Sequence, residues 1–174
     1  MILIRAATEA DIPDASRVKA KGWGTSYAES GSPDLLAAWT TPQHWWPDLK
    51  HAVENPDCYL YLACDGAFVV GIAHGSFRPT TYLASLHVLP DCRGRRIGVR
   101  LIGQVARAAV ERQLVTLALD VVTTNSRAIA FYERLGAVPI QEHAADWASG
   151  ITEVRMVIPD LADMVRRIEA VTSG

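Results

Sequence analysis

The chain has 174 residues, and its 17 Lys and Arg against 19 Asp and Glu give a formal net charge of -2 and a pI near 6.2. This near-neutral balance argues against partners recruited by an overall electric field, so we expect neither nucleic acid nor a membrane as a partner. No apolar stretch reaches the roughly 20 residues that span a bilayer, and the N-terminus MILIRAATEAD does not resemble a secretory signal. We therefore expect a cytoplasmic protein that forms a single domain over 1–174.

The cysteines bear on redox state and on metal binding. Cys58, Cys64 and Cys92 are odd in number and do not have the spacing of metal ligands. We expect reduced thiols and no metal.

The first third of the chain reads as a short strand followed by helices. Ile2 to Arg5 is an apolar start typical of a strand, and Thr8 to Asp11 resembles a capping box that opens a helix. Ser32-Pro33 and Thr41-Pro42 each place a proline at a first helical position, which predicts two further helices.

The middle of the chain changes to strand character. Cys58 to Cys64 and Ala67 to Phe77 predict two strands joined at Asp65-Gly66, a dipeptide typical of a hairpin turn. Thr81 to Leu89 predicts another strand. Gly98 to Arg112 then has helical periodicity.

Strands and helices alternate in the remainder of the chain. Leu114 to Val122 is a nearly continuous apolar run, as expected of a strand covered on both faces. Ser126 to Leu135 predicts a helix, and strands are expected around 137–141 and 151–158. The alternation predicts an α/β (mixed α+β) domain with helices covering a central sheet.

A last amphipathic helix is expected as a C-terminal extension at about 160–172. Its apolar stripe packs either inside the molecule or in a dimer interface. The sequence therefore allows two oligomeric states, a monomer and a homodimer.

A strand, an Arg/Gly loop and a helix follow one another between Leu86 and Val99. The first N–H groups of a helix lack intrahelical partners, and together with the helix dipole they form a site for a phosphate. Two glycines leave room for a pyrophosphate near the backbone, and three arginines supply charge-assisted hydrogen bonds. A solvated turn and a nucleic-acid patch are the alternatives, and the near-neutral net charge argues against the second. The residues of the proposed phosphate site are the glycines Gly94 and Gly98 and the arginines Arg93, Arg95 and Arg96.

The pattern Leu-x-Val-x-Pro-x-x-Arg-Gly-x-x-Ile-Gly in this segment resembles the coenzyme A motif of the GNAT superfamily of N-acetyltransferases. Arg93 and Gly98 match the ends of that motif, while Arg96 replaces its middle glycine, a position that contributes mainly its backbone N–H. A second segment, Asn125 to Ala137, resembles the family signature Asn-x-x-Ala-x-x-Phe-Tyr-x-x-x-Gly-Phe, with Ala137 in place of the final aromatic residue.

The resemblance implies a fold and a co-substrate. The fold is a central mixed, mostly antiparallel sheet of about six to seven strands flanked by helices, and the co-substrate is acetyl-CoA. The residues that would bind acetyl-CoA are Leu86, His87, Val88, Arg93, Gly94, Arg95, Arg96, Ile97, Gly98, Val99, Asn125, Ala128, Phe131 and Tyr132.

The resemblance also implies catalytic roles. Val88 matches the strand amide that stabilises the tetrahedral oxyanion, and Tyr132 matches the general acid that protonates the leaving thiolate. The glutamate that serves as base in some members aligns with Tyr82, and a phenol is a poor base at neutral pH. His74 or His87 is a substitute base. An ordered water chain, as in other members, would need no dedicated base.

In this family the first two helices and the loop between them usually wall the acceptor site, which places Trp23, Tyr27, Glu29 and Trp39 there. Aromatic rings and a carboxylate fit a cationic amine, although tryptophans at helical spacing are more often part of a core. We expect an acyl-CoA-dependent N-acyltransferase that moves an acetyl group to a primary amine of a small molecule by direct attack. The alternatives are a protein N-terminal or lysine acetyltransferase and a non-catalytic acyl-CoA-binding or sensing domain.

Overall fold

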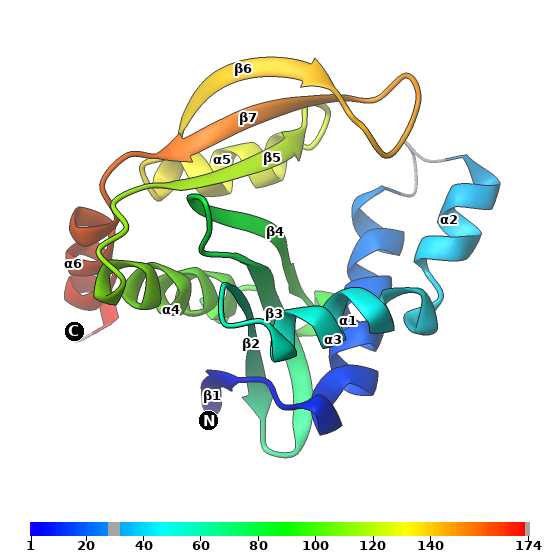
Figure 1. The fold of residues 1–174 in the computed structure, drawn as a ribbon, viewed down its shortest axis with the longest axis horizontal. Coiled ribbons are helices and arrows are strands. Elements are labelled where there is room, and N and C mark those ends of the chain that lie inside the picture. The colour runs from blue at the N-terminus through cyan, green and yellow to red at the C-terminus, as the bar shows by residue number, and fades with distance from the viewer. Residues whose placement is uncertain (28–31, 173–174) are drawn as a thin grey trace.

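The computed structural model describes residues 1–27 and 32–172 of the chain. A sheet of seven strands, in the order β1-β2-β3-β4-β5-β7-β6, runs through these ranges. Neighbouring strands are antiparallel except for β4 and β5, which are parallel. The sheet and its flanking helices confirm the expected mixed, mostly antiparallel architecture (Figure 1).

The observed elements follow the predicted order. The strands are β1 (Ile2–Ala6), β2 (Cys58–Asp65), β3 (Phe68–Ser76), β4 (Thr81–Val88), β5 (Leu117–Val122), β6 (Val138–Ala144) and β7 (Thr152–Ile158). The α-helices are α1 (Ile12–Ser26), α2 (Pro33–Trp39), α3 (Trp46–Glu54), α4 (Ile97–Glu111), α5 (Ser126–Arg134) and α6 (Leu161–Thr172). Short 3-10 turns lie at Glu9–Asp11, Pro42–Trp45 and Pro90–Cys92.

Local signals in the sequence explain several of these boundaries. The backbone N–H of Thr8 donates to the Asp11 carboxylate at 2.8 Å, which is one half of the predicted capping box. Ser32 accepts from the N–H of Leu35 and so caps α2. Gly66 has a φ of +60°, the left-handed conformation that a tight hairpin turn requires.

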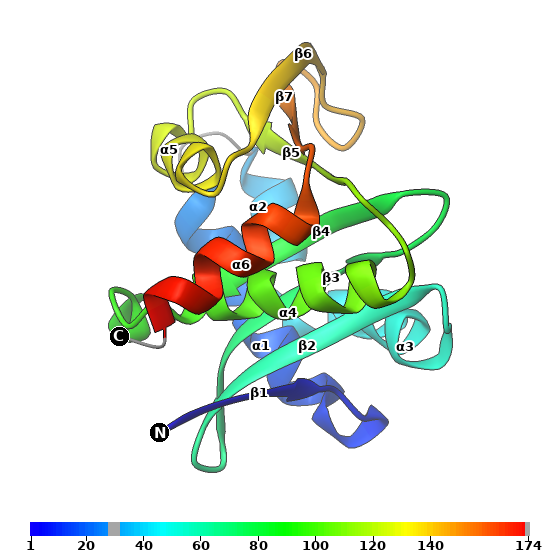
Figure 2. The same cartoon turned by 90° about the vertical axis from the view of Figure 1, so that its left-hand side faces the viewer.

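Helices pack on both faces of the sheet. On one face α4 and α6 lie side by side (Figure 2) and share a core cluster with strands β4, β5 and β7. On the other face α1 and α3 cover β2 and β3 around a second cluster that includes Val18, Leu49 and Ile72. The apolar stripe of α6 packs inside the molecule, because Leu161, Met164 and Ile168 are buried.

The sequence predicted that the strand from Leu114 to Val122, which is β5 in the structure, is covered on both faces, and this prediction is wrong. The strand begins at Leu117, and only the face that carries Leu117 and Leu119 is fully buried. Ala118 and Asp120 on the opposite face are half-buried. The apolar run in the sequence concealed this asymmetry, because Asp120 forms an ion pair with Arg155 of β7 on that face instead of packing under a helix.

Two strands in the middle of the sheet separate after a short stretch of pairing. β4 pairs with β5 only from Thr81 to Leu83, opposite Leu117 to Leu119, while β4 itself continues to Val88. The edge of β4 beyond Leu83 therefore faces a gap instead of a neighbouring strand. None of the helices in the described ranges is both long and apolar enough to cross a membrane.

Candidate functional site

A cavity of about 490 Å³ lies between the end of β4, the start of α4 and α5. All but one of the predicted acetyl-CoA residues line it, together with five residues that the sequence did not single out. Those five are Thr25, Ser26, Cys92, Arg127 and Arg134. The exception is Arg95, which lies outside the cavity and forms an ion pair with Asp65 at 2.8 Å.

The N-terminus of α4 supplies backbone donors to this cavity. Arg100 is the first residue whose N–H reaches a helical carbonyl, that of Arg96 at 3.1 Å. The N–H groups of Ile97, Gly98 and Val99 therefore precede the intrahelical pattern, and all three residues line the cavity. This is the geometry with which a helix binds a phosphate.

Arg96, in the place of the motif's middle glycine, has a φ of +57°. This left-handed conformation costs a side-chain-bearing residue roughly 1–2 kcal/mol. The strain explains physically why glycine suits the position, and it shows that the loop keeps its shape with arginine there.

The charged arginines that line this cavity make it positive. Among the residues that the structure describes, the lining includes four arginines and no Asp or Glu. Burial, and then the nearby Arg127, lower the pKa of Arg93, as expected when two cations share a site built for an anion. Arg127 and Arg134 escaped the sequence analysis because they lie at variable positions of the α5 signature.

The backbone of β4 presents a donor to the gap. The N–H of Leu89 donates to the Val70 carbonyl of β3 at 2.9 Å. Successive N–H groups of a strand point to opposite sides, so the N–H of Val88 points away from β3 and toward the gap beside β5. Val88 also lines the cavity.

A second, smaller cavity of about 120 Å³ adjoins the first. Six residues line both cavities, which places them at the junction: Ser26, Leu86, His87, Asn125, Ala128 and Tyr132. Burial, and then Tyr27, raise the pKa of Tyr132, so its phenol keeps its proton at neutral pH. The Asn125 side chain accepts from the N–H of Ala128 at 3.1 Å and caps the helix that carries Tyr132.

The two histidines lie in different surroundings. His87 lines both cavities, and burial, followed by the charges of Lys19 and Arg93, lowers its pKa to about 3. His74 lines neither cavity. It is buried with its Nδ1 3.4 Å from the Lys19 ammonium. Lys19 also pairs with Asp48 at 2.7 Å.

The aromatic residues expected at the acceptor site form one cluster. Trp23 and Tyr27 line the smaller cavity, whereas Trp39 packs on Trp23 with ring centroids 4.4 Å apart. Trp147 packs against Trp23 and Tyr27 at 5.2 and 5.4 Å. Glu29 lies outside the described residues. The rings pack on one another and are half-buried, and Trp23 and Tyr27 also face the smaller cavity.

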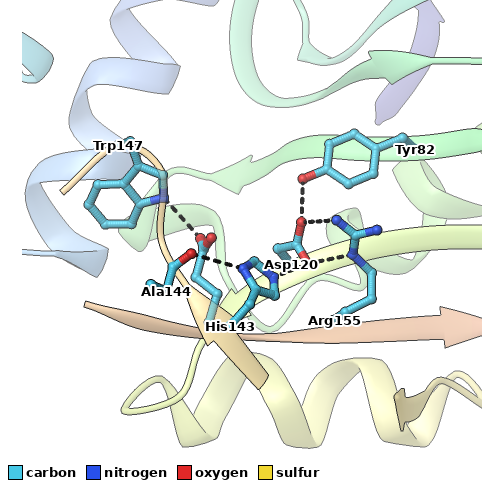
Figure 3. Close-up of polar contacts among 7 residues, drawn as sticks. Tyr82, Asp120, His143, Ala144, Trp147 and Arg155 are labelled. Carbon is cyan, nitrogen blue, oxygen red and sulfur yellow. Dashed lines mark hydrogen bonds and ion pairs between the residues drawn. The ribbon is translucent and has the colours of Figure 1, made fainter. Parts of the chain in front are cut away.

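The smaller cavity contains a carboxylate that the sequence analysis missed. Asp120 is the charged residue among its lining side chains, and it accepts from Arg155, His143 and Tyr82 (Figure 3). Burial raises its pKa, but the hydrogen bonds from these three side chains outweigh burial and leave the pKa below its ordinary value. The sequence feature that could have revealed this residue is the position of Asp120 as the acid within the otherwise apolar strand Leu117–Val122. Tyr82, in the position of the family's glutamate, donates to this acid at 2.9 Å.

One group of side chains has the composition of a metal site. Asp120, His143 and Glu153 offer ligand atoms that all lie within 4.8 Å of one another. Arg155 already donates to both oxygens of Asp120, at 2.6 and 2.8 Å, so the group is better described as an ion-pair network.

Comparison with known proteins identifies relatives of this chain. Over 110 residues the chain is 32% identical to thialysine N-epsilon-acetyltransferase of Mus musculus, covering 55% of the chain and 64% of that protein. It is 38% identical over 66 residues to the Bos taurus protein of the same name, covering 38% of each. The chain thus spans less than two thirds of the length of these curated relatives.

Solved structures share the fold. The PaiA N-acetyltransferase of Thermoplasma acidophilum, in complex with coenzyme A, superposes with a TM-score of 0.71 at 17% identity, over 89% of the chain and 98% of that protein. The ribosomal-protein-S18-alanine N-acetyltransferase of Escherichia coli gives 0.69 at 16% identity, over 92% and 94%. The family model described as "Acetyltransferase (GNAT) family" matches residues 23–137, so the chain belongs to the GNAT acetyltransferase family.

Proposed function

We propose that this chain transfers the acetyl group of acetyl-CoA to a primary amine of a small molecule, in a single domain over 1–174. The observation that carries the proposal is the junction of an arginine-lined cavity with a small cavity whose described lining contains the Asp120 carboxylate. The first suits the phosphates of coenzyme A, and the second suits an amine.

The residues at the junction supply the chemistry of acyl transfer. The amine attacks the thioester carbonyl, and the developing oxyanion lies within reach of a donor such as the Val88 N–H, which points toward the gap. The C–S bond then breaks, and the thiolate takes the proton of the Tyr132 hydroxyl. The nitrogen, which became positively charged on attack, gives up one proton as the amide forms, and a proton returns to the Tyr132 phenolate. A phenol with a raised pKa is protonated before the reaction, as a general acid must be.

The attacking amine must first lose a proton. An alkyl amine has a reference pKa near 10.4, about seven units above the value of about 3 for His87, so proton transfer to this imidazole is steeply uphill. His74 lines neither cavity. We infer that the proton leaves to solvent without a dedicated base, and that Asp120 orients the ammonium group beforehand.

The size and charge of the smaller cavity support a compact cationic acceptor. Its volume of about 120 Å³ admits an amine and a short chain, and its lining, over the part of the chain that the structure describes, has no Lys or Arg to pair with a carboxylate next to the amine. Thialysine, named for two of the relatives, carries its reactive amine far from its carboxylate and is therefore a suitable first candidate.

An acetyl transfer assay tests the proposal. The purified chain is incubated with acetyl-CoA and a panel of thialysine, lysine, spermidine, an aminoglycoside and a peptide with an N-terminal alanine. Release of free thiol is followed, and the product is identified by mass. We expect turnover of a small amine. Faster turnover of the peptide would favour the protein acetyltransferase alternative, and binding of acetyl-CoA with no turnover would favour the sensing alternative.

A further inference from the structure

A network of charged side chains lies on the half-buried face of β5, β6 and β7, next to the smaller cavity. Strand register places it there: Asp120 of β5 is opposite Arg155 of β7, and His143 of β6 is opposite Glu153 of β7. Residues two apart on a strand share a face, so Arg155 and Glu153 point the same way. Figure 3 shows Arg155 and Tyr82 directed at the Asp120 carboxylate.

Every acceptor position of Asp120 is occupied. Its Oδ1 accepts from Arg155 Nε at 2.6 Å and from His143 Nε2 at 3.0 Å. Its Oδ2 accepts from an Arg155 terminal nitrogen at 2.8 Å and from the Tyr82 hydroxyl at 2.9 Å. A carboxylate has about four lone-pair sites. An ammonium group that enters the cavity therefore finds no vacant acceptor on Asp120 while all four donors are in place.

His143 differs from the other donors because it can stop donating. Its Nδ1 lies 3.0 Å from the Ala144 carbonyl oxygen and its Nε2 lies 3.0 Å from Asp120, so only the doubly protonated imidazolium donates to both. When Nε2 releases its proton to water, the remaining proton on Nδ1 still serves Ala144. The Nε2 lone pair then faces the Oδ1 lone pair and repels it.

We propose that His143 is a positioning residue that determines whether Asp120 can accept a hydrogen bond from the substrate ammonium. The imidazolium occupies Oδ1, and the neutral imidazole leaves that oxygen to the amine. The inference rests on the proposed function, because it concerns how the acceptor amine is held.

The groups around His143 determine the pH at which it loses its proton. Asp120 and Glu153 stabilise the imidazolium, Arg155 opposes it, and Tyr82 is neutral. The hydrogen bonds to Asp120 and to the Ala144 carbonyl raise the pKa of His143 above its ordinary value. Its side chain is 31% exposed, so its proton exchanges directly with water. Amine binding should therefore strengthen as the pH rises through a value above about 6.5.

Two variants separate the states of His143. His143→Ala removes the donor, and we expect its KM for the amine at pH 6 to fall about tenfold relative to the wild type, a typical effect of one charge-assisted hydrogen bond. His143→Gln keeps a neutral donor at all pH values, and its KM should stay at the wild-type acidic level. Neither variant should change the affinity for acetyl-CoA. His51→Ala, at an exposed histidine on α3, is the control and should follow the wild-type profile.

The measurement is KM against pH with acetyl-CoA and thialysine, or with the fastest amine of the panel. Ionisation of the amine gives a limb that moves with the amine, whereas the His143 limb stays fixed and disappears in both variants. Persistence of the fixed limb in both variants, in an enzyme that turns over, would overturn the inference and leave the proposed function intact. Absence of wild-type turnover with every amine would instead reject the proposed function and, with it, the inference.

A second readout does not depend on turnover. NMR titration of the histidine ring signals should give His143 a pKa above 6.5 in the wild type and a lower value in Asp120→Asn, whose amide is a weaker acceptor. A pKa at or below 6.5 in the wild type would contradict the contact on which the inference depends.

Discussion

Gly22 of α1 and His87 of β4 meet with no space between them for a side chain: a Cβ added to Gly22 would lie 2.3 Å from Nδ1 of His87. A glycine inside a helix costs roughly 1 kcal/mol relative to alanine. Here it makes room for the imidazole that lines both cavities.

Gly22→Ala should therefore destabilise the protein, although alanine is the better helix former. Displacing His87 is an overpacking change that typically costs about 1–3 kcal/mol, which exceeds the gain in helix propensity. Urea denaturation measures the difference. Gly103→Ala in α4 is the matched control, since its Cβ would meet Ile168 at 3.4 Å, an ordinary contact, and should leave stability equal or higher. Equal stabilities for the two variants would contradict the account of Gly22.

The left-handed conformation of Arg96 predicts an order of stability between two variants. Arg96→Gly and Arg96→Ala both remove the guanidinium, but only glycine adopts a φ of +57° without strain. The glycine variant should be more stable by about 1 kcal/mol in urea denaturation. An alanine variant of equal or greater stability would show that position 96 is not strained.

The arginines around the larger cavity predict unequal effects on coenzyme A binding. Arg127 lines the cavity, whereas Arg95 is engaged by Asp65 outside it. Calorimetry should show that Arg127→Gln weakens coenzyme A binding about tenfold or more, the effect expected of a lost charge-assisted contact to phosphate. Arg95→Gln should change it by less than about twofold. The reverse order would indicate that coenzyme A lies along the outer side of the loop.

Tyr132→Phe separates chemistry from binding. Removing the proposed acid should lower kcat by a factor of about 100 or more. Affinity for coenzyme A should stay nearly constant, because the ring keeps its packing. Steady-state kinetics and calorimetry on the same preparation check both parts. An unchanged kcat would remove Tyr132 from the mechanism.

His74 predicts a loss of stability in acid. Burial, and then the neighbouring Lys19 ammonium, lower its pKa to about 4, whereas in the unfolded chain it is near 6.5. Between these values the unfolded state binds more protons, so the stabilising contribution is complete above about pH 6.5 and is lost as the pH falls toward 4. Over the whole range the contribution is on the order of 3 kcal/mol. Denaturation midpoints at pH 7 and pH 5 should differ less for His74→Gln than for the wild type, and an equal difference in the two proteins would contradict this account of His74.

The parts of this protein that could be predicted from the sequence are those in which local chemistry determines structure. The arginine and glycine loop, the capping box at Thr8 and the hairpin at Gly66 each depend on residues within a few positions of one another. Asp120 could not be assigned from its own strand, because its role comes from side chains of β4, β6 and β7 that only the sheet brings together. The contact of His74 with Lys19, outside both cavity linings, likewise follows from strand register and the packing of α1, which periodicity does not encode.

The early end of pairing between β4 and β5 has a kinetic consequence. Both cavities open on the one gap it leaves, so donor and acceptor can be present together and neither has to depart before the other arrives. Initial-rate plots at several fixed concentrations of the second substrate should then give intersecting lines, the signature of a ternary complex. Parallel lines would mean that the acyl group is first transferred to the protein, and that coenzyme A leaves before the amine binds. The short stretch of missing pairing between β4 and β5 thus predicts that both substrates bind before the acetyl group is transferred.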